Sequence, residues 1–219
     1  MPKWGMIIDL EQCINCKACE VACTQTNNVP RGSRRNVFDF GIDHVKDEIR
    51  ISLPMSCMQC ENAPCLEVCP TKATYQRPDG IVDIDPDLCT GCGYCIVGCP
   101  YNTRSIVELD DNNPIDEKVN DEDLQSFLGT CTKCNFCVVK VDAGLQQGLM
   151  PGIDIEATPS CVNMCSSKAL HFGDLENPNS NISKMVREEN VECLHPEVGT
   201  APSLWYILPE DYTLKNNMK

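Results

Sequence analysis

The chain has 219 residues and a formal net charge of −14, with 32 acidic residues against 18 basic ones. Its length is enough for one sizeable domain or two small ones. A protein that binds nucleic acid would need the opposite charge balance, so we expect no nucleic-acid partner. No apolar run approaches the length of a membrane-spanning helix.

The most informative residue type is cysteine, of which the chain has 18. Hydrophobic residues make up 42% of the chain, but this figure counts the cysteines. Without them the apolar content is modest for a self-sufficient core. We therefore expect a group bound to the cysteines to fill part of the interior, with folding coupled to its binding.

Three kinds of chemistry use many cysteines, and the spacing of the residues separates them. Disulfide scaffolds are usually short secreted chains. Zinc sites pair two CxxC units across a dozen or more residues. Here four cysteines fall within one short run such as 13–23. The spacing therefore favours iron–sulfur clusters.

Two cysteine runs repeat the spacing C-x2-C-x2-C-x3-C at an offset of 76 residues (89 − 13). They are Cys13, Cys16, Cys19 and Cys23, and then Cys89, Cys92, Cys95 and Cys99. This spacing is typical of bacterial ferredoxins with [4Fe–4S] clusters. A tight loop reaches three irons of a cubane but not the fourth, so the fourth cysteine of each run is expected to ligate a neighbouring cluster.

Two further cysteine groups depart from this spacing. They are Cys57, Cys60, Cys65 and Cys69, and the split set of Cys134, Cys137, Cys161 and Cys165. Four groups of four give 16 ligands (4 × 4), which leaves Cys131 and Cys193 over. Cys131-x2-Cys134-x2-Cys137 is also a plausible triplet, so the start of the fourth group stays open. Cys193 is most simply a buried or free thiol.

Strand-like runs lead into two of the cysteine loops, at Trp4–Leu10 and Ile81–Ile84. Pro78-Asp79-Gly80 predicts a turn before the second of these runs. The acidic stretch Asp110–Asp123 predicts a solvated loop. The repeated unit of strand, cysteine loop, short helix and strand favours an α+β fold.

The chain resembles the four-cluster iron–sulfur subunits of molybdenum or tungsten oxidoreductases of the dimethyl sulfoxide reductase family. The resemblance covers nearly the whole chain. Its specific motifs are Cys13–Cys23, Ser56–Cys65 (SCMQCENAPC), Cys89–Arg104 (CTGCGYCIVGCPYNTR), Lys133–Cys137 (KCNFC) and Gly199–Pro202 (GTAP). Two features depart from the family pattern: Ser166 stands where a proline usually follows the last cysteine, and the insert 138–160 is longer than expected.

The resemblance implies two ferredoxin-like modules, one inserted into the other, each with two clusters. Residues 1–50 and 125–175 would form the outer module, 51–124 the inserted module, and 176–219 a C-terminal docking extension. We number the four cysteine groups as motifs one to four in chain order, beginning at Cys13, Cys57, Cys89 and Cys134. The resemblance implies that motif one pairs with motif four, and motif two with motif three. The implied ligand sets of the four [4Fe–4S] clusters are Cys13, Cys16, Cys19 and Cys165; Cys134, Cys137, Cys161 and Cys23; Cys57, Cys60, Cys65 and Cys99; and Cys89, Cys92, Cys95 and Cys69.

The resemblance also implies an electron-transfer subunit without catalytic residues of its own. Such a subunit relays electrons to or from a large molybdopterin-containing catalytic subunit, with a membrane anchor or a soluble redox carrier as a further partner. The alternatives are the iron–sulfur subunit of a formate dehydrogenase or hydrogenase complex, and a free polyferredoxin shuttle. No nucleotide-binding loop points to chemistry within the chain itself.

The expected compartment follows from the first residues and from thiol chemistry. The first strand-like run begins at Trp4, which leaves no room for a signal peptide, and Arg34–Arg35 has no apolar stretch behind it. We expect the chain to fold around its clusters in the cytoplasm, where thiols stay reduced. A periplasmic location would require export together with a signal-bearing partner; otherwise the chain stays cytoplasmic.

Overall fold

The structure is a computed structural model that describes residues 1–43, 49–108 and 127–209. The predicted acidic loop Asp110–Asp123 lies outside these ranges. The strands are β1 (Trp4–Asp9), β2 (Arg35–Asp43), β3 (Ile49–Ser56), β4 (Thr74–Gln76), β5 (Val82–Ile84), β6 (Ser105–Ile106), β7 (Cys131–Thr132), β8 (Leu170–Asp174), β9 (Val191–Glu192) and β10 (Leu204–Ile207). The helices are α1 (Ala18–Asn27), α2 (Pro64–Glu67), α3 (Tyr94–Val97), α5 (Val138–Gln146), α6 (Ser160–Asn163) and α7 (Asn181–Glu188), with the 3-10 turns η2 (Ile155–Ala157) and η3 (Pro196–Val198).

A four-stranded sheet with the strand order β8-β1-β10-β9 forms the larger part of the molecule. β1 runs antiparallel to β8 and parallel to β10, so that Met6 lies opposite both Phe172 and Leu204. Because β1 is central, every one of its residues is buried, which explains its continuous apolar run. The predicted strand at Trp4–Leu10 is confirmed.

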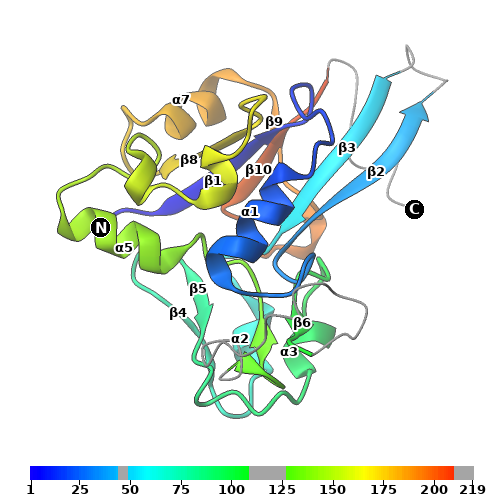
Figure 1. Cartoon of the computed structure of the whole chain (residues 1–219), viewed down its shortest axis with the longest axis vertical. Coiled ribbons are helices and arrows are strands. Elements are labelled where there is room, and N and C mark those ends of the chain that lie inside the picture. The colour runs from blue at the N-terminus through cyan, green and yellow to red at the C-terminus, as the bar shows by residue number, and fades with distance from the viewer. Residues whose placement is uncertain (44–48, 109–126, 210–219) are drawn as a thin grey trace.

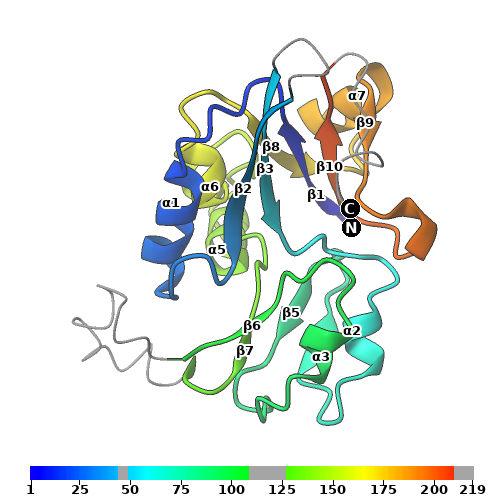
Figure 2. The ribbon, with the colours of Figure 1, turned by 90° about the vertical axis from the view of Figure 1, so that its right-hand side faces the viewer.

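The two faces of this sheet are covered differently. On one face, Ile7 and Ile207 pack with Ile182 of α7. On the other face, Met6 and Ile8 belong to a core that also contains buried cysteines. Figure 2 shows α1 and α6 on one side of the sheet and α7 on the other. We call the buried cysteines of this core the cysteine layer. It lies on the face of β1 that is turned away from α7.

The segment after residue 176 belongs to this sheet, since it supplies α7, β9 and β10. Leu204 and Tyr206 of β10 are completely buried. A docking role for this segment stays a prediction, but the segment also completes the core.

The rest of the molecule consists of much shorter elements. β4 pairs with β5 and β6 with β7, each pair antiparallel, while α2 and α3 are single turns. Gly80, with φ +84°, closes the turn before β5, and its N–H donates to Arg77 O at 3.0 Å. The predicted turn and strand are confirmed. Figure 1 shows these elements below the large sheet.

We call residues 57–108 and 127–132 the hairpin region, and the other described residues the sheet region. The antiparallel ribbon of β2 and β3 leads from one to the other, and β3 ends one residue before Cys57. The mixture of helices and small sheets confirms the α+β class. No helix in the described parts of the chain combines the length and the apolar character needed to span a bilayer.

Candidate metal centres

The four cysteine loops share one backbone feature. In each loop, the residue two positions after the first cysteine has a positive φ: Asn15 (56°), Gln59 (48°), Gly91 (66°) and Phe136 (56°). Residues other than glycine seldom adopt this conformation, so its recurrence means that all four loops turn in the same way. The corresponding residue after Cys131 would be Lys133, whose φ is not positive. The loop conformation of the fourth motif therefore begins at Cys134.

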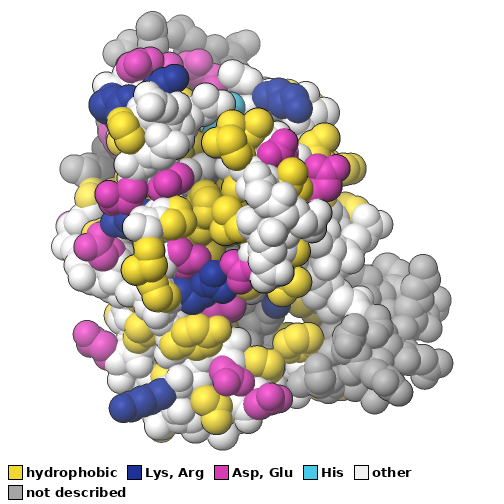
Figure 3. Space-filling model, turned by 90° about the vertical axis from the view of Figure 1, so that its left-hand side faces the viewer, with side chains coloured by type: hydrophobic (Ala, Val, Ile, Leu, Met, Phe, Trp, Pro, Cys, Tyr) yellow, Lys and Arg dark blue, Asp and Glu magenta, His cyan; other side chains and the backbone are white. Residues whose placement is uncertain are grey.

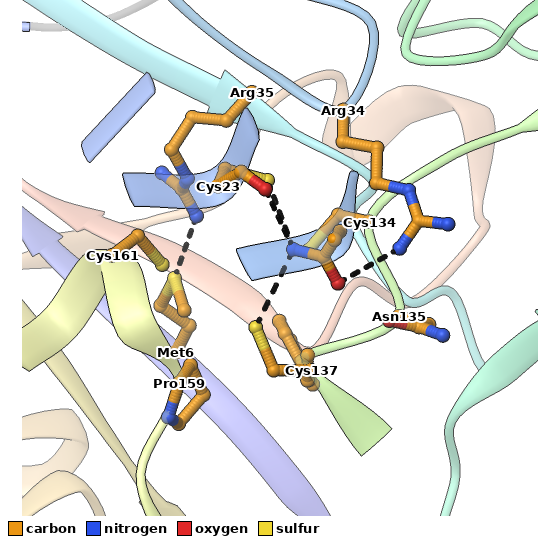
Figure 4. Close-up of a pocket in the computed structure, with 11 residues that line it drawn as sticks. Met6, Cys23, Arg34, Arg35, Cys134, Asn135, Cys137, Pro159 and Cys161 are labelled. Carbon is orange, nitrogen blue, oxygen red and sulfur yellow. Dashed lines mark hydrogen bonds between the residues drawn. The ribbon is translucent and has the colours of Figure 1, made fainter. Parts of the chain in front are cut away.

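Four cysteines from three segments line one hollow in the sheet region. Cys23 comes from α1, Cys134 and Cys137 precede α5, and Cys161 comes from α6. Figure 4 shows these thiols around the hollow, with the side chain of Arg35 beside them. Cys131 is not among the residues that line it.

Two further hollows lie in the hairpin region. One is lined by Cys57, Cys60, Cys65 and Cys99, and the other by Cys69, Cys89, Cys92, Cys95 and also Cys131. In each, three thiols come from one motif and one comes from its partner motif; Cys131, which belongs to neither motif, is an additional thiol at the second hollow. The structure thus brings together the sets that the resemblance implies, while their ligation of iron stays a prediction.

The remaining set, Cys13, Cys16, Cys19 and Cys165, is also a group of neighbours. Burial raises the pKa of the Cys13 thiol, the backbone N–H of Asn15 opposes this, and the charges of Cys165 and Cys16 raise the pKa further. Burial likewise raises the pKa of Cys19, with Arg35 opposing and Cys13 and Cys165 adding to the increase. The packing of α1 against α6 brings these segments together.

Cys131 lies against a hollow of the hairpin region. Its Sγ is 3.5 Å from Cys95 Sγ, and its backbone N–H donates to Cys89 Sγ at 3.3 Å. The pairing of β7 with β6 places it there. Sequence spacing alone offered Cys131 as a partner of Cys134, because spacing does not reveal that the chain passes from one region to the other at this point. Cys193, just after β9, is half-buried and outside all four groups.

The buried thiols are poor acids in the absence of a metal. Burial, together with neighbouring thiolates, raises the pKa of Cys23 and of Cys60 to about 12. Both thiols are therefore protonated at neutral pH. Because metals bind cysteine as thiolate, loading these sites must release protons.

Arg35 tests whether the hollow in the sheet region suits an anionic group. This side chain is 2% exposed, and its Nη2 donates to Ser56 Oγ at 3.1 Å and lies 3.0 Å from Met6 Sδ. Its Nε and Nη1 have no hydrogen-bond partner among the described residues. A buried cation with unused donors is costly unless an anion compensates it, and a thiolate-bound cluster would be such an anion.

The four motif thiols around each hollow also indicate an iron–sulfur cluster. Four cysteine thiols are the ligand set of a [4Fe–4S] cluster. Within the described ranges, no three His, Cys, Asp or Glu side chains converge on a site for one metal ion. A cubane binds each of its cysteines through a separate iron, so its thiols need not converge on one point. The residues present therefore fit [4Fe–4S] clusters.

Comparison with known proteins gives matches over nearly the whole chain. Residues 12–73 and 50–118 each match the 4Fe–4S dicluster domain. The chain is 39% identical to a Halobacterium salinarum protein provisionally named as the iron–sulfur B subunit of a dimethyl sulfoxide reductase, over 94% of this chain and 79% of the relative. It is 35% identical to the B subunit of the tetrathionate reductase of Salmonella typhimurium, over 95% of this chain and 74% of the relative. It is 36% identical to the B chain of the polysulfide reductase of Wolinella succinogenes, over 94% of both proteins.

These matches span more than two thirds of each relative's own length, and the two domain matches contain the first three cysteine motifs. The relatives are named as the B subunits or B chains of reductases, with an iron–sulfur role stated for one of them. The chain therefore belongs to the iron–sulfur subunits of the dimethyl sulfoxide reductase family and is an electron-transfer subunit, not a catalytic one.

Proposed function

We propose that the chain holds four [4Fe–4S] clusters and relays electrons through them to or from a molybdopterin-containing catalytic subunit. The observation that carries the proposal is the exchange of cysteines between motifs. Each of the four groups takes three thiols from one motif and the fourth from another. This exchange is the arrangement expected for paired ferredoxin-type clusters.

The clusters, when bound, would supply one-electron redox chemistry. The chain's own residues hold them through sixteen thiolates, in the sets Cys13, Cys16, Cys19 and Cys165; Cys134, Cys137, Cys161 and Cys23; Cys57, Cys60, Cys65 and Cys99; and Cys89, Cys92, Cys95 and Cys69. We number clusters one to four in this order. Groups outside the sets donate toward these sulfurs: the Cys131 N–H reaches Cys89 Sγ, and Arg104 Nη2 reaches Cys65 Sγ at 3.0 Å.

We also infer that the sheet and hairpin regions correspond to two ferredoxin-like modules, the second inserted into the first. Clusters one and two would lie in the sheet region, and clusters three and four in the hairpin region. The chain leaves the sheet region through β3 and returns after β7. Both features support an insertion at about the predicted limits of 51–124.

A catalytic partner is supported by the names of the relatives and by the surface. The loop between α5 and α6 exposes Met150, Ile153 and Ile155, each by more than half, and Val139 of α5 is 81% exposed. Figure 3 shows apolar side chains gathered among acidic ones on the face that carries this loop. Large exposed apolar side chains in one area are typical of an interaction surface. A free shuttle would have no use for such a surface.

Metal analysis tests the cluster proposal. Anaerobically isolated protein should contain about sixteen iron and about sixteen sulfide per chain, four of each per cluster. About one zinc per four cysteines, with little iron, would show the proposal to be wrong. Purification from the native source should also recover a large subunit that contains molybdenum or tungsten. A monomeric holoprotein without any partner would favour the free polyferredoxin instead.

We further propose that the chain folds around its clusters in the cytoplasm and reaches the periplasm, if its partner works there, by export with that partner. Reduced thiols are required for cluster insertion, which supports cytoplasmic assembly. Fractionation of native cells against a cytoplasmic marker enzyme tests the export step. Export with a partner is wrong if the clusters and the large subunit both stay with the marker.

A further inference from the structure

Three long cationic side chains are buried in the cysteine layer: Arg35 is 2% exposed, Arg104 5% and Lys133 2%. Burying a charge costs several kcal/mol unless opposite charge compensates it. None of the three forms an ion pair with a carboxylate in the described parts of the chain. Cysteines are among the other neighbours of all three cations: Arg35 lines a hollow with four of them, Arg104 contacts Cys65 Sγ, and Lys133 contacts the backbone of Cys134.

The two arginines lie beside cysteine groups of different regions. Arg35 lines the hollow of cluster two. Arg104 Nη2 is 3.0 Å from Cys65 Sγ of cluster three. Its Nη1 is 3.8 Å from Cys131 Sγ, which lines the hollow of cluster four. The arginines thus lie within the two regions, one in each.

Lys133 lies at the junction between the regions. Its Nζ donates to Cys134 O at 3.0 Å and to Val82 O, which lines the hollow of cluster three. Gln59 reinforces the same junction, because its Nε2 donates to Cys134 O at 2.6 Å while its Oε1 accepts from Val82 N at 2.7 Å. The ammonium group is thereby fixed between the loops of clusters two and three.

We propose that each buried cation raises the reduction potentials of the clusters beside it, and that Lys133 does this for clusters two and three, across the junction of the two regions. The inference rests on the proposed four clusters. Reduction adds one negative charge to a cluster, and a fixed cation nearby stabilises the reduced form. Cluster potentials respond to local charge and to hydrogen bonding near sulfur.

Both Lys133 and Arg104 lie beside cluster three. Arg104 Nη2 is 3.0 Å from Cys65 Sγ, and Lys133 Nζ donates to Val82 O, which lines the same hollow. Cluster three should therefore respond to the loss of either cation.

The test compares charge removal with charge retention at one position. Lys133→Gln keeps a hydrogen-bond donor but removes the charge, Lys133→Arg keeps the charge, and Lys184→Gln removes an exposed charge from α7 on the opposite face of the sheet. Iron content is measured first, since a wild-type chain without about sixteen iron contradicts the proposed function itself. Redox titration followed by electron paramagnetic resonance then gives the four potentials.

We expect Lys133→Gln to lower two of the four potentials. The reduced-to-oxidised ratio at fixed potential should fall at least tenfold for each, which corresponds to about 59 mV for a one-electron couple. Lys133→Arg and Lys184→Gln should leave the potentials unchanged. The proposal is wrong if Lys133→Gln shifts none of the four potentials or all of them. It is also wrong if Lys133→Arg lowers the potentials of the same clusters by the same amount.

Arg104→Gln supplies an independent test of the pairing, which also serves if Lys133→Gln does not load iron fully. It should lower two potentials, those of clusters three and four. When both variants load, one cluster and only one should respond to both, because cluster three lies beside both cations. The proposal would be overturned if the two variants lowered the potentials of the same two clusters, or of two pairs of clusters with no member in common. It would also be overturned if Arg104→Gln shifted no potential.

Discussion

The sheet region and the hairpin region hold their cysteines by different means. In the sheet region, α7 packs on one face of a four-stranded sheet through Ile7, Ile182 and Ile207, in a cluster that contains no cysteine. In the hairpin region, α2 and α3 have four residues each, β4 and β5 three, and β6 and β7 two. Helices and hairpins this short are not stable by themselves. The hairpin region therefore depends much more on what its thiols bind.

Removal of all metal should separate the two regions most clearly. In reduced, chelator-stripped protein we expect the hairpin region to lose its amide protection while β1, β8 and β10 keep theirs, with a marked loss of circular dichroism overall. Hydrogen exchange followed by mass spectrometry measures this directly, and protein incubated without chelator is the control. Equal loss of amide protection in both regions would contradict the expected difference between them, and so would full retention of protection in both.

A single thiol should affect one cluster only, in the region where that thiol lies. Cys137→Ser should lose or convert cluster two in the sheet region, so that iron falls from about sixteen to about 12–15 per chain. Cys131→Ser should keep all the iron but alter the paramagnetic signal of cluster four, because Cys131 contacts Cys95 and Cys89. Loss of iron in Cys131→Ser with none in Cys137→Ser would reverse the assignment of the fourth motif.

Two equivalent loop positions allow a matched comparison of the regions. Gly91, with φ +66°, has no room for a side chain, because an added Cβ would lie 2.1 Å from Gly129 O. Gly91→Ala should therefore destabilise the hairpin region by about 2–5 kcal/mol. Asn15, 76 positions earlier (91 − 15), has the same backbone conformation with a side chain already present. Asn15→Ala should cost only about 1 kcal/mol. Thermal unfolding of the loaded variants, with hydrogen exchange to locate the effect, checks both values; equal costs would contradict the argument.

The smallest expected effect is a pH dependence confined to the sheet region. Burial lowers the pKa of His171 on β8 from its ordinary 6.5, although Asp9 opposes this. The unfolded chain then binds a proton more readily than the folded one, so stability should fall as the pH drops below about 6.5. Both tryptophans, Trp4 and Trp205, lie in the sheet region, so urea unfolding of stripped protein followed by their fluorescence reports on it. The decrease in the free energy of unfolding with falling pH should disappear in His171→Gln and persist in His195→Gln.

The sequence was most informative where the determinants are local. Spacing predicted the cysteine loops, and the short run Trp4–Leu10 and the turn before β5 were predicted from residues close together in the chain. The family resemblance supplied the grouping of thiols from distant motifs, which spacing alone left open at Cys131. That ambiguity has a physical cause: Cys131 and Cys134 are three residues apart, but β7 directs one to each region.

Burial of charge was not predictable in the same way. Lys133 is one lysine beside a cysteine. Arg35 is the second of two adjacent arginines, and the first, Arg34, is only half-buried and donates to Thr132 Oγ1 and Asn27 Oδ1. Nothing in their immediate sequence distinguishes a buried cation from a solvated one, because their burial depends on strands and loops distant in sequence. The position of β10 inside the sheet is another long-range property, and it had no local signal beyond the apolar run itself.

The pairing of β1 with β10 has a consequence for the order of events during synthesis. Met6 pairs with Leu204, 198 positions later (204 − 6), so the ribosome must make nearly all the described residues before the central strand gains this neighbour. At about 5–20 residues per second, the wait is roughly 10–40 s. Throughout that interval one edge of β1 is open, and the nascent chain presents its thiols from an incomplete layer. The core that contains the buried cysteines is therefore complete only when Leu204 and Tyr206 of the last strand have packed into it.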